Sequence, residues 1–246
     1  MGVHRVQHSQ ERTRSRTEMP VPRQTLTILG LGSLLSERSA RVTFPELTGW
    51  RLVRVHGYRR VFAHTPSIFM HRGIADAVTL QMASLGAEPC TGASFVATAF
   101  DVPDDGTGME AFREREEEYD LRMVPFESLD DDHQLADSDR EAMLCVCSSD
   151  EDYIKRWGIG RFQSMYTAHG LRTCWDWPTD SGLRPCATYL RHCALAAEKL
   201  GPIAYRSFLD ETYLCDRRTT IRDYLAQHPE VMSTPPPADL AERYGG

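Results

Sequence analysis

The stretch "TLTILGLGSLLS", residues 25–36, decides how the fold of this sequence is interpreted. Its apolar, β-branched start is typical of a buried strand, and the two glycines of Gly30-Leu31-Gly32-Ser33 then allow a tight turn. A dinucleotide-binding fingerprint needs a third small residue, but Leu35 stands there and no regular βαβ unit follows, so we expect no nicotinamide cofactor. Two interpretations stay open: a structural turn at a strand end, or a loop whose backbone N–H groups bind an anion such as a carboxylate.

Around this loop, strand-like segments come first and helical ones later. The strand-like patterns cover residues 25–31, 51–64, 74–82, 94–101, 121–127 and 142–148. One helix, starting near Thr107, interrupts them, and after Tyr153 helical patterns cover 184–201, 203–214 and 219–228. Because few parallel crossovers are available, this order predicts an α+β fold with a mixed or closed sheet of about six strands.

Both ends of the chain differ in composition from its middle. Residues 1–23 are polar and Arg-rich without periodicity, which predicts a disordered N-terminal tail. Residues 231–246, with "STPPP", are predicted to be a second tail. Between them we predict one domain, residues 24–230, with its strands in 24–150 and a helical extension in 151–230.

Composition excludes several classes of protein. The net charge of −7 over 246 residues argues against a general nucleic-acid binder, which needs a basic face. No apolar run approaches the ~20 residues of a membrane span, so we expect no membrane partner. The seven irregularly spaced cysteines are interpreted as reduced core residues, which favours the cytoplasm. The Arg-rich start leaves organellar import open, although Glu11 and Glu18 are atypical of a transit peptide.

The stretch "TGMEAFREREEEYD", residues 107–120, carries five glutamates. Thr107 and Glu110 form a capping-box signature for a helix start. At about 100° per residue, one face collects three apolar side chains and one acid: Met109, Phe112, Glu116 and Tyr119. The remaining acids of the run are predicted to point elsewhere: Glu114 and Glu118 away from this face, and Glu117 to its side.

Glu116 is therefore the candidate for chemistry. A carboxylate that faces apolar groups has a raised pKa unless it is paired, which suits a general acid/base near neutral pH. The alternative is that Glu116 lies at the edge of the stripe and reaches water or a nearby arginine.

Four pieces of the sequence, in order, resemble the γ-glutamylcyclotransferase superfamily, in particular its ChaC-type, glutathione-degrading branch. They are "ILGLGSLL", "HGYRRVFAH" with "MHRG" and "AVTL", "ATAFDVP", and "FREREEEYDLRMV". The family pattern Arg-Glu-x-x-Tyr falls on Arg115 to Tyr119 and selects Glu116, the residue that the helix phase also selects. The first piece departs from the family signature, because Leu31 stands in place of a tyrosine.

The resemblance implies a small closed β-barrel flanked by helices and cleavage of a γ-glutamyl peptide to 5-oxoproline. The substrate's own α-amino group attacks its γ-carbonyl, so no metal or cofactor is expected. Glu116 would be the catalytic acid/base. The expected substrate-binding residues are Gly32, Ser33 and Leu34 through their N–H groups, with Arg72 and Tyr119 as helpers. The alternative function is a cyclotransferase-like protein that binds a partner or small amine without turnover, and the sequence leaves the oligomeric state unknown.

Overall fold

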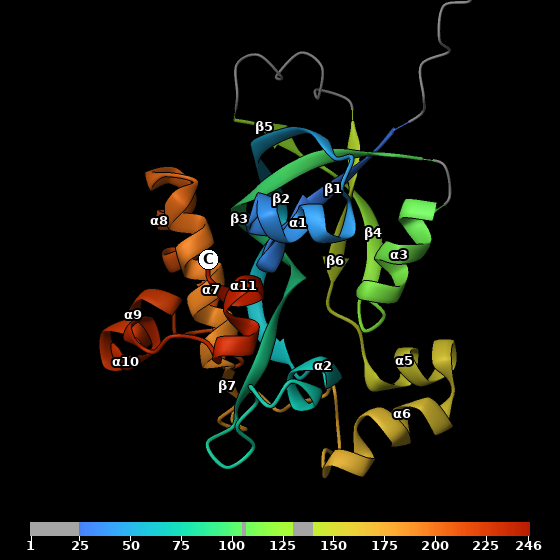
Figure 1. Ribbon diagram of the computed structural model, residues 1–246, viewed down its shortest axis with the longest axis vertical. Helices are drawn as coiled ribbons and strands as arrows, with labels where there is room; N and C mark the ends of the chain where they lie inside the picture. The colour runs from blue at the N-terminus through green and yellow to red at the C-terminus, as the bar shows by residue number, and fades with distance from the viewer. Residues whose placement is uncertain (1–24, 105–106, 130–139) are drawn as a thin grey trace, which may run out of the picture.

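The computed structural model of the chain describes residues 25–104, 107–129 and 140–246 (Figure 1). The predicted disordered tail, residues 1–23, lies outside the described residues, and so does most of the acidic stretch between Glu127 and Glu141.

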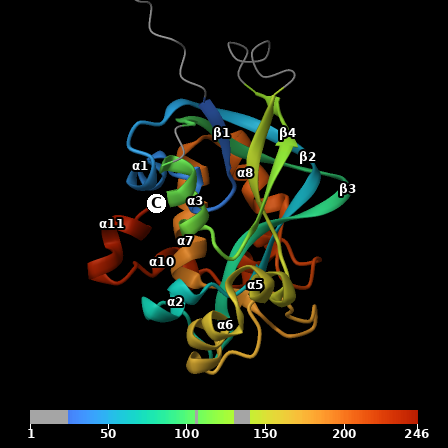
Figure 2. The same ribbon diagram turned by 90° about the vertical axis from the view of Figure 1, so that its right-hand side faces the viewer.

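One mixed sheet forms the centre of the molecule. Its main path runs β4-β6-β1-β3-β2-β5, and it curls into a half-barrel (Figure 2). The strands of this path are β1 (Thr25–Gly30), β2 (Thr48–His64), β3 (Gln81–Pro103), β4 (Asp120–Pro125), β5 (Glu127–Ser128) and β6 (Glu141–Val146). Two short strands from the C-terminal half join it: β7 (Arg184–Pro185) beside β3 and β8 (Thr212–Tyr213) beside β2. The predicted α+β class with about six strands is confirmed.

The long strands β2 and β3 are the backbone of the sheet. They pair antiparallel from Thr48 opposite Asp101 to His64 opposite Ser84, with register shifts that bend the pair. The strand β1 pairs antiparallel with β3 and parallel with β6, so Gly30 leads out of the middle of the sheet.

The strand predicted over residues 74–82 is mostly wrong, because β3 begins only at Gln81. Asp76 forms a turn instead: its carboxylate accepts hydrogen bonds from the N–H groups of Val78 and Thr79. Val78 is 94% exposed, so the apolar pattern here reports no buried face.

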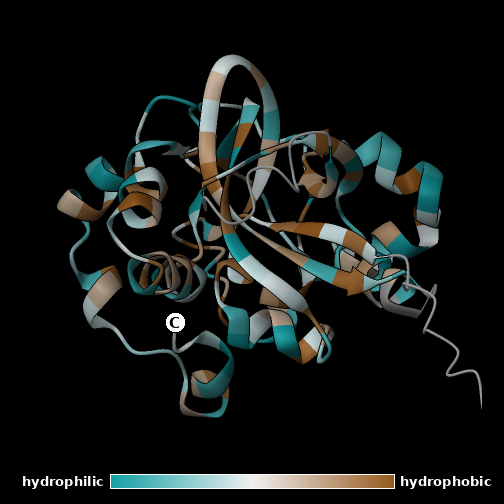
Figure 3. Cartoon of the chain, turned by 90° about the horizontal axis from the view of Figure 1, so that it is seen from above, coloured by the Kyte–Doolittle hydropathy of each residue, from teal (hydrophilic) through white to brown (hydrophobic). Residues whose placement is uncertain are grey.

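The helices surround the sheet. Figure 1 shows α7 to α11 on one side, α3 on the other, and α5 and α6 at one end, while Figure 3 shows apolar and polar residues following one another along both strands and helices. The helices are α1 (Glu37–Thr43), α2 (Ser67–His71), α3 (Thr107–Arg115), α5 (Asp150–Trp157), α6 (Ile159–Met165), α7 (Ala187–Lys199), α8 (Pro202–Asp210), α9 (Ile221–Gln227), α10 (Glu230–Ser233) and α11 (Ala241–Tyr244), with 3₁₀ turns η1 (Ser33–Leu35), η2 (Thr167–His169) and η3 (Ala238–Leu240). No helix in the described part of the chain is long and apolar enough to cross a membrane.

A buried arginine ties the helical half to the sheet. Arg60 of β2 is fully buried, and it donates hydrogen bonds to the Val96 carbonyl (3.1 Å) and to Ser207 Oγ on α8 (2.9 Å). Its guanidinium lies 5.1 Å from the ring centroid of Phe95 and 5.2 Å from that of Phe208. Burial lowers the pKa of Arg60 to about 9, so it stays charged at neutral pH. The helical extension thus shares a core with the strands.

The C-terminal segment 231–246 is not the free tail that the sequence predicts. It contains η3 and α11, and Tyr244 is 3% exposed, edge-on to His192 of α7 with ring centroids 5.8 Å apart. Val231 is also buried. Isolated apolar residues in a polar, proline-rich segment give no periodicity, so their burial could not be read from the sequence.

The seven cysteines are all free, and five of them are buried, which agrees with their interpretation as reduced thiols. Cys90 and Cys147 are only half-buried.

Candidate active site

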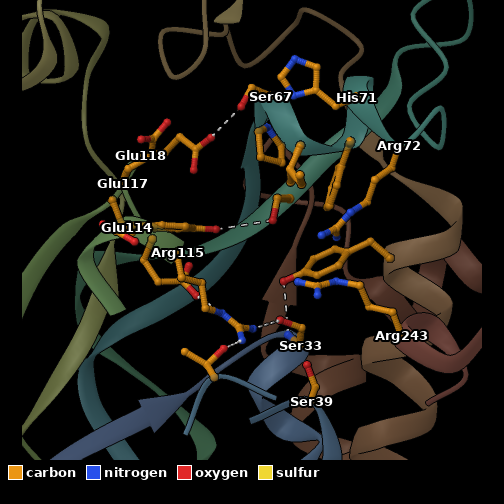
Figure 4. Close-up of a pocket in the computed structure, with 18 of the residues that line it drawn as sticks. Ser33, Ser39, Ser67, His71, Arg72, Glu114, Arg115, Glu117, Glu118 and Arg243 are labelled. Atoms are coloured by element: carbon orange, nitrogen blue, oxygen red, sulfur yellow. Dashed lines mark hydrogen bonds and ion pairs between the residues drawn. The ribbon is translucent and has the colours of Figure 1, made fainter. Parts of the chain in front are cut away.

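A cavity of about 650 Å³ opens where the loop after β1 meets α2, the end of α3, α7 and α11 (Figure 4). Four predicted site residues line it: Ser33, Arg72, Glu116 and Tyr119. Gly32 and Leu34, the other two predicted residues, are not among the residues that line the cavity. The fold therefore brings predicted site residues as far apart in the chain as Ser33 and Tyr119 to one cavity.

Glu116 lies just beyond the end of α3. Its N–H donates to the Phe112 carbonyl (2.9 Å), and its side chain is only 14% exposed. Nε of Arg115 donates to Glu116 Oε1 at 2.8 Å. Both interpretations of the sequence therefore hold in part, because Glu116 is turned inward and is also paired with an arginine.

The pKa of Glu116 reflects this balance. Burial raises it above its ordinary value, and the nearby charges of Arg115 and Arg243 act in the opposite direction. The C-terminal end of a helix also disfavours a negative charge. A carboxyl in this setting can take up and return a proton closer to neutral pH than a surface glutamate can.

Glu118 is a second buried carboxyl, and the prediction that it points away from the interior is wrong. It is 6% exposed, and it accepts hydrogen bonds from the Tyr166 hydroxyl (3.0 Å) and from Ser67 Oγ (3.5 Å). Burial raises its pKa to about 7. The helix ends at Arg115, so the helical spacing used to place these side chains does not extend to residue 118.

Of the other acids in the run, Glu114 is exposed, as predicted. Glu117 forms an ion pair with Arg161 of α6. Among the described residues, neither Glu114 nor Glu117 forms an ion pair with Arg115, whereas Glu116 does.

Arg115 organises one wall of the cavity. Beyond its contact with Glu116, its Nη1 donates to Thr43 Oγ1 (2.5 Å) and its Nη2 to Ser33 Oγ (3.1 Å). It therefore joins the end of α3 to α1 and to the loop after β1. We had not expected this role, although Arg115 belongs to the motif that selected Glu116.

The glycine loop is shaped by a phenol from the helical half. The Ser33 N–H donates to the hydroxyl of Tyr189 on α7 at 3.3 Å. A Cβ atom on Gly32 would lie 2.3 Å from the same oxygen, so only glycine fits beside it. Gly32 has a φ of −129°, so its backbone does not need a positive φ. Glycine is required here because the Tyr189 hydroxyl approaches so closely. Leu31, at the signature tyrosine position, is buried.

Tyr119 is part of the wall under the cavity. Its hydroxyl donates to the Leu85 carbonyl (2.8 Å) and lies 3.4 Å from Ser84 Oγ. Its ring stands edge-on to His64 and Trp175, with centroids 4.8 Å and 5.4 Å away. These contacts tie the Tyr119 hydroxyl to residues of β3.

Two further arginines reach the cavity from the side opposite α3. Arg72, at the end of α2, donates from Nη1 to the Tyr244 hydroxyl at 2.5 Å. Arg243 of α11 also lines the cavity, and Figure 4 shows both guanidinium groups pointing into the space beside Ser33. The segment that carries Arg243 was predicted to be a tail, so sequence reasoning missed this residue.

A buried cysteine that is influenced by the charge of Glu116 is unsuited to act as a nucleophile. Cys145 of β6 is buried, and burial, followed by the charge of Glu116, raises its pKa well above the ordinary value. A protonated thiol is a weak nucleophile. Among the described residues, no group of three or more His, Cys, Asp or Glu side chains is arranged to hold a metal ion.

No family model matches this sequence, and no curated protein matches it. Among solved structures, the chain is similar to a yeast γ-glutamyl cyclotransferase specific to glutathione, at 11% identity over 85% of this chain and 96% of that chain, with a TM-score of 0.47. It is also similar to another γ-glutamyl cyclotransferase, at 10% identity over 57% of this chain and 85% of that chain, with a TM-score of 0.36. A third is an uncharacterized protein from Homo sapiens, at 10% identity over 74% of this chain and 84% of that chain, with a TM-score of 0.44.

Proposed function

We propose that this protein is a γ-glutamylcyclotransferase-type enzyme that converts a γ-glutamyl peptide or amine into 5-oxoproline and a free amine. The observation that carries the proposal is the line of contacts from Glu116 through Arg115 to Ser33 on the wall of the cavity. This line combines a proton-transfer group of raised pKa with donors for an anion, and the reaction needs both.

In the proposed reaction, Glu116 takes a proton from the substrate's α-ammonium group. The freed amine attacks the γ-carbonyl carbon, and Glu116 returns its proton to the leaving nitrogen as the bond from that carbon to this nitrogen breaks. The ring nitrogen then loses its second proton, which the released amine takes up. Because nucleophile and carbonyl belong to one molecule, holding the substrate folded supplies much of the rate. The proton transfers by Glu116 contribute a further ~10²–10⁴-fold.

Arg115 and Ser33 are the proposed partners of the substrate's α-carboxylate. Arg115 presents a fixed guanidinium, which binds carboxylates well. The N–H of Ser33 already donates to Tyr189, at the long distance of 3.3 Å. An incoming carboxylate is a stronger acceptor than a phenol oxygen and would displace this weak contact.

A second candidate function, binding without turnover, is favoured by this same contact. If the Tyr189 hydroxyl keeps the Ser33 N–H, the loop cannot hold the α-carboxylate for ring closure. The buried, titratable Glu116 favours the enzyme, since a binding surface gains nothing from a desolvated carboxyl.

The test is incubation of the purified protein with glutathione and a panel of γ-glutamyl dipeptides and amines, without added metal, and assay of 5-oxoproline. We expect 5-oxoproline from at least one member of the panel, together with an equal amount of the free amine or peptide. Binding of a panel member without any 5-oxoproline would favour the second candidate function.

A further inference from the structure

The side of the cavity away from α3 carries two positive charges, and one of them, Arg243, is near enough to act on Glu116 without forming an ion pair with it. Arg72 and Arg243 both line the cavity, and neither forms an ion pair with an acid of residues 25–104, 107–129 or 140–246. Arg115 differs from them, because it forms an ion pair with Glu116 and also donates hydrogen bonds to Thr43 and Ser33.

The C-terminal helix holds the two arginines in place. The Tyr244 hydroxyl accepts the hydrogen bond from Arg72, and the Arg72 guanidinium lies 5.7 Å from the centroid of the Tyr244 ring. Tyr244 itself is buried. Arg243 is the preceding residue, so the same short helix that orients Arg72 delivers a second guanidinium to the cavity.

These positive charges act on one another. Burial, and then the neighbouring charges of Arg72 and Arg115, lower the pKa of Arg243. Like charges gathered at a cavity repel one another, and an anionic ligand relieves that repulsion. The arrangement therefore favours a ligand that carries a negative charge at this end of the cavity.

We propose that Arg72 and Arg243 form a second anion site, which selects γ-glutamyl compounds whose leaving group carries its own carboxylate. The inference rests on the proposed function, since it assigns the two ends of one substrate. The α-carboxylate lies toward Arg115 and Ser33, and the leaving group lies beyond the scissile bond, toward Arg72 and Arg243. The substrate class is then γ-glutamyl peptides with a free C-terminus, in preference to γ-glutamyl amines, and Arg243 determines the specificity.

The experiment compares two substrates that differ in one charge, γ-glutamyl-alanine and its C-terminal amide. Steady-state kinetics are measured for the wild type, Arg243→Gln and Arg243→Lys. Glu242→Gln is the matched control, because Glu242 lies on the same helix but pairs with Arg38 at the surface, with 86% of its side chain exposed.

The wild type should prefer the free acid by about tenfold or more in kcat/KM, the worth of a charged hydrogen bond. Arg243→Gln should remove most of that preference, with KM for the acid rising about tenfold more than KM for the amide. Arg243→Lys should recover part of the preference, and Glu242→Gln should keep all of it. Equal kcat/KM for acid and amide in the wild type, or an equal loss for both in Arg243→Gln, would overturn the second anion site while leaving the proposed function intact.

Binding separates the two proposals. Calorimetry with the Glu116→Gln variant measures affinity for both compounds without relying on turnover. If the wild type forms no 5-oxoproline but the acid still binds about tenfold more tightly than the amide, and Arg243→Gln abolishes the difference, the anion site stands and the proposed function fails. If neither compound is turned over or bound, both proposals fail.

Discussion

Replacement of Glu118 by glutamine should change how the stability of the protein depends on pH. Glu118 is a buried residue of the cavity lining, with the Tyr166 hydroxyl as its main hydrogen-bond partner. Glutamine has nearly the same shape, and its carbonyl oxygen can accept the same hydrogen bond. The substitution therefore removes the titration of the side chain and leaves the packing in place.

The sign follows from the pKa in the two states. Burial raises the pKa of Glu118 from an ordinary 4.5 to about 7 in the folded protein. Between these values the folded state keeps the proton and the unfolded state has lost it, so the free energy of unfolding falls as pH rises from about 4.5 to about 7. The full difference corresponds to about 3 kcal/mol, an upper value because the charges of neighbouring Glu117 and Glu116 contribute to the raised pKa of Glu118.

The assay is urea unfolding of the wild type and of Glu118→Gln at pH 4, 6 and 8. Relative to the wild type, the variant should gain up to about 3 kcal/mol between pH 4 and pH 8, while other titrating groups cancel in the comparison. Glu114→Gln, at an exposed position of the same run, is the control and should follow the wild type at each pH. A constant difference between Glu118→Gln and the wild type from pH 4 to pH 8 would refute the assignment of Glu118 as a buried, titrating carboxyl.

Two further predictions concern packing. Gly32→Ala should lower the free energy of unfolding by about 1–3 kcal/mol and reduce kcat/KM, because its Cβ would lie 2.3 Å from the Tyr189 hydroxyl oxygen. Adding Tyr189→Phe, which removes that oxygen, should restore part of both losses, and strictly additive effects in this double-mutant cycle would contradict the close approach. Arg60→Ala should cost at least about 3 kcal/mol in urea unfolding, because it leaves a cavity and removes a donor from the Val96 carbonyl and from Ser207 Oγ. Arg222→Ala, which breaks an exposed pair with Asp210, is its control and should cost under about 1 kcal/mol.

Much of the sheet could be predicted because its signals are local. The strands β1, β2, β4 and β6 lie where apolar, β-branched runs stand between turn residues, and the end of β1 falls at Gly30 as expected. The prediction of a strand over residues 74–82 was wrong because of Asp76. Its carboxylate accepts hydrogen bonds from the N–H groups of Val78 and Thr79, and this turn replaces the extended backbone of a strand. The alternation of apolar and polar residues does not show that a side chain competes with a neighbouring strand for backbone N–H groups.

Glu116 could be found because two local features agree on it. The apolar face of α3 is real, with Met109 and Phe112 both buried, and the motif from Arg115 to Tyr119 lies within five residues. Glu118 was missed because the placement assumed a helix that continues past Arg115. Because the backbone leaves the helical conformation after Arg115, the Glu118 side chain points inward and not outward.

The rest of the site depends on contacts that sequence spacing does not encode. Ser33 and Tyr189 are 156 residues apart, and Arg72 and Tyr244 are 172 residues apart. Arg243 and Tyr244 belong to a four-residue helix, too short to give a periodic signal. Their positions follow from the packing of the helical half against β2 and β3.

The most direct test of the central claim is 5-oxoproline formation from one accepted γ-glutamyl substrate, followed by proton NMR for the wild type, Glu116→Gln and Glu118→Gln side by side. Glu116→Gln should lose at least about 100-fold in kcat, the contribution of a general acid/base, with unfolding curves that match the wild type. Glu118→Gln should keep activity within about tenfold, because its carboxyl is held by Tyr166 away from Arg115. Full activity in Glu116→Gln, or loss of activity in Glu118→Gln alone, would contradict the assignment of Glu116 as the catalytic acid/base.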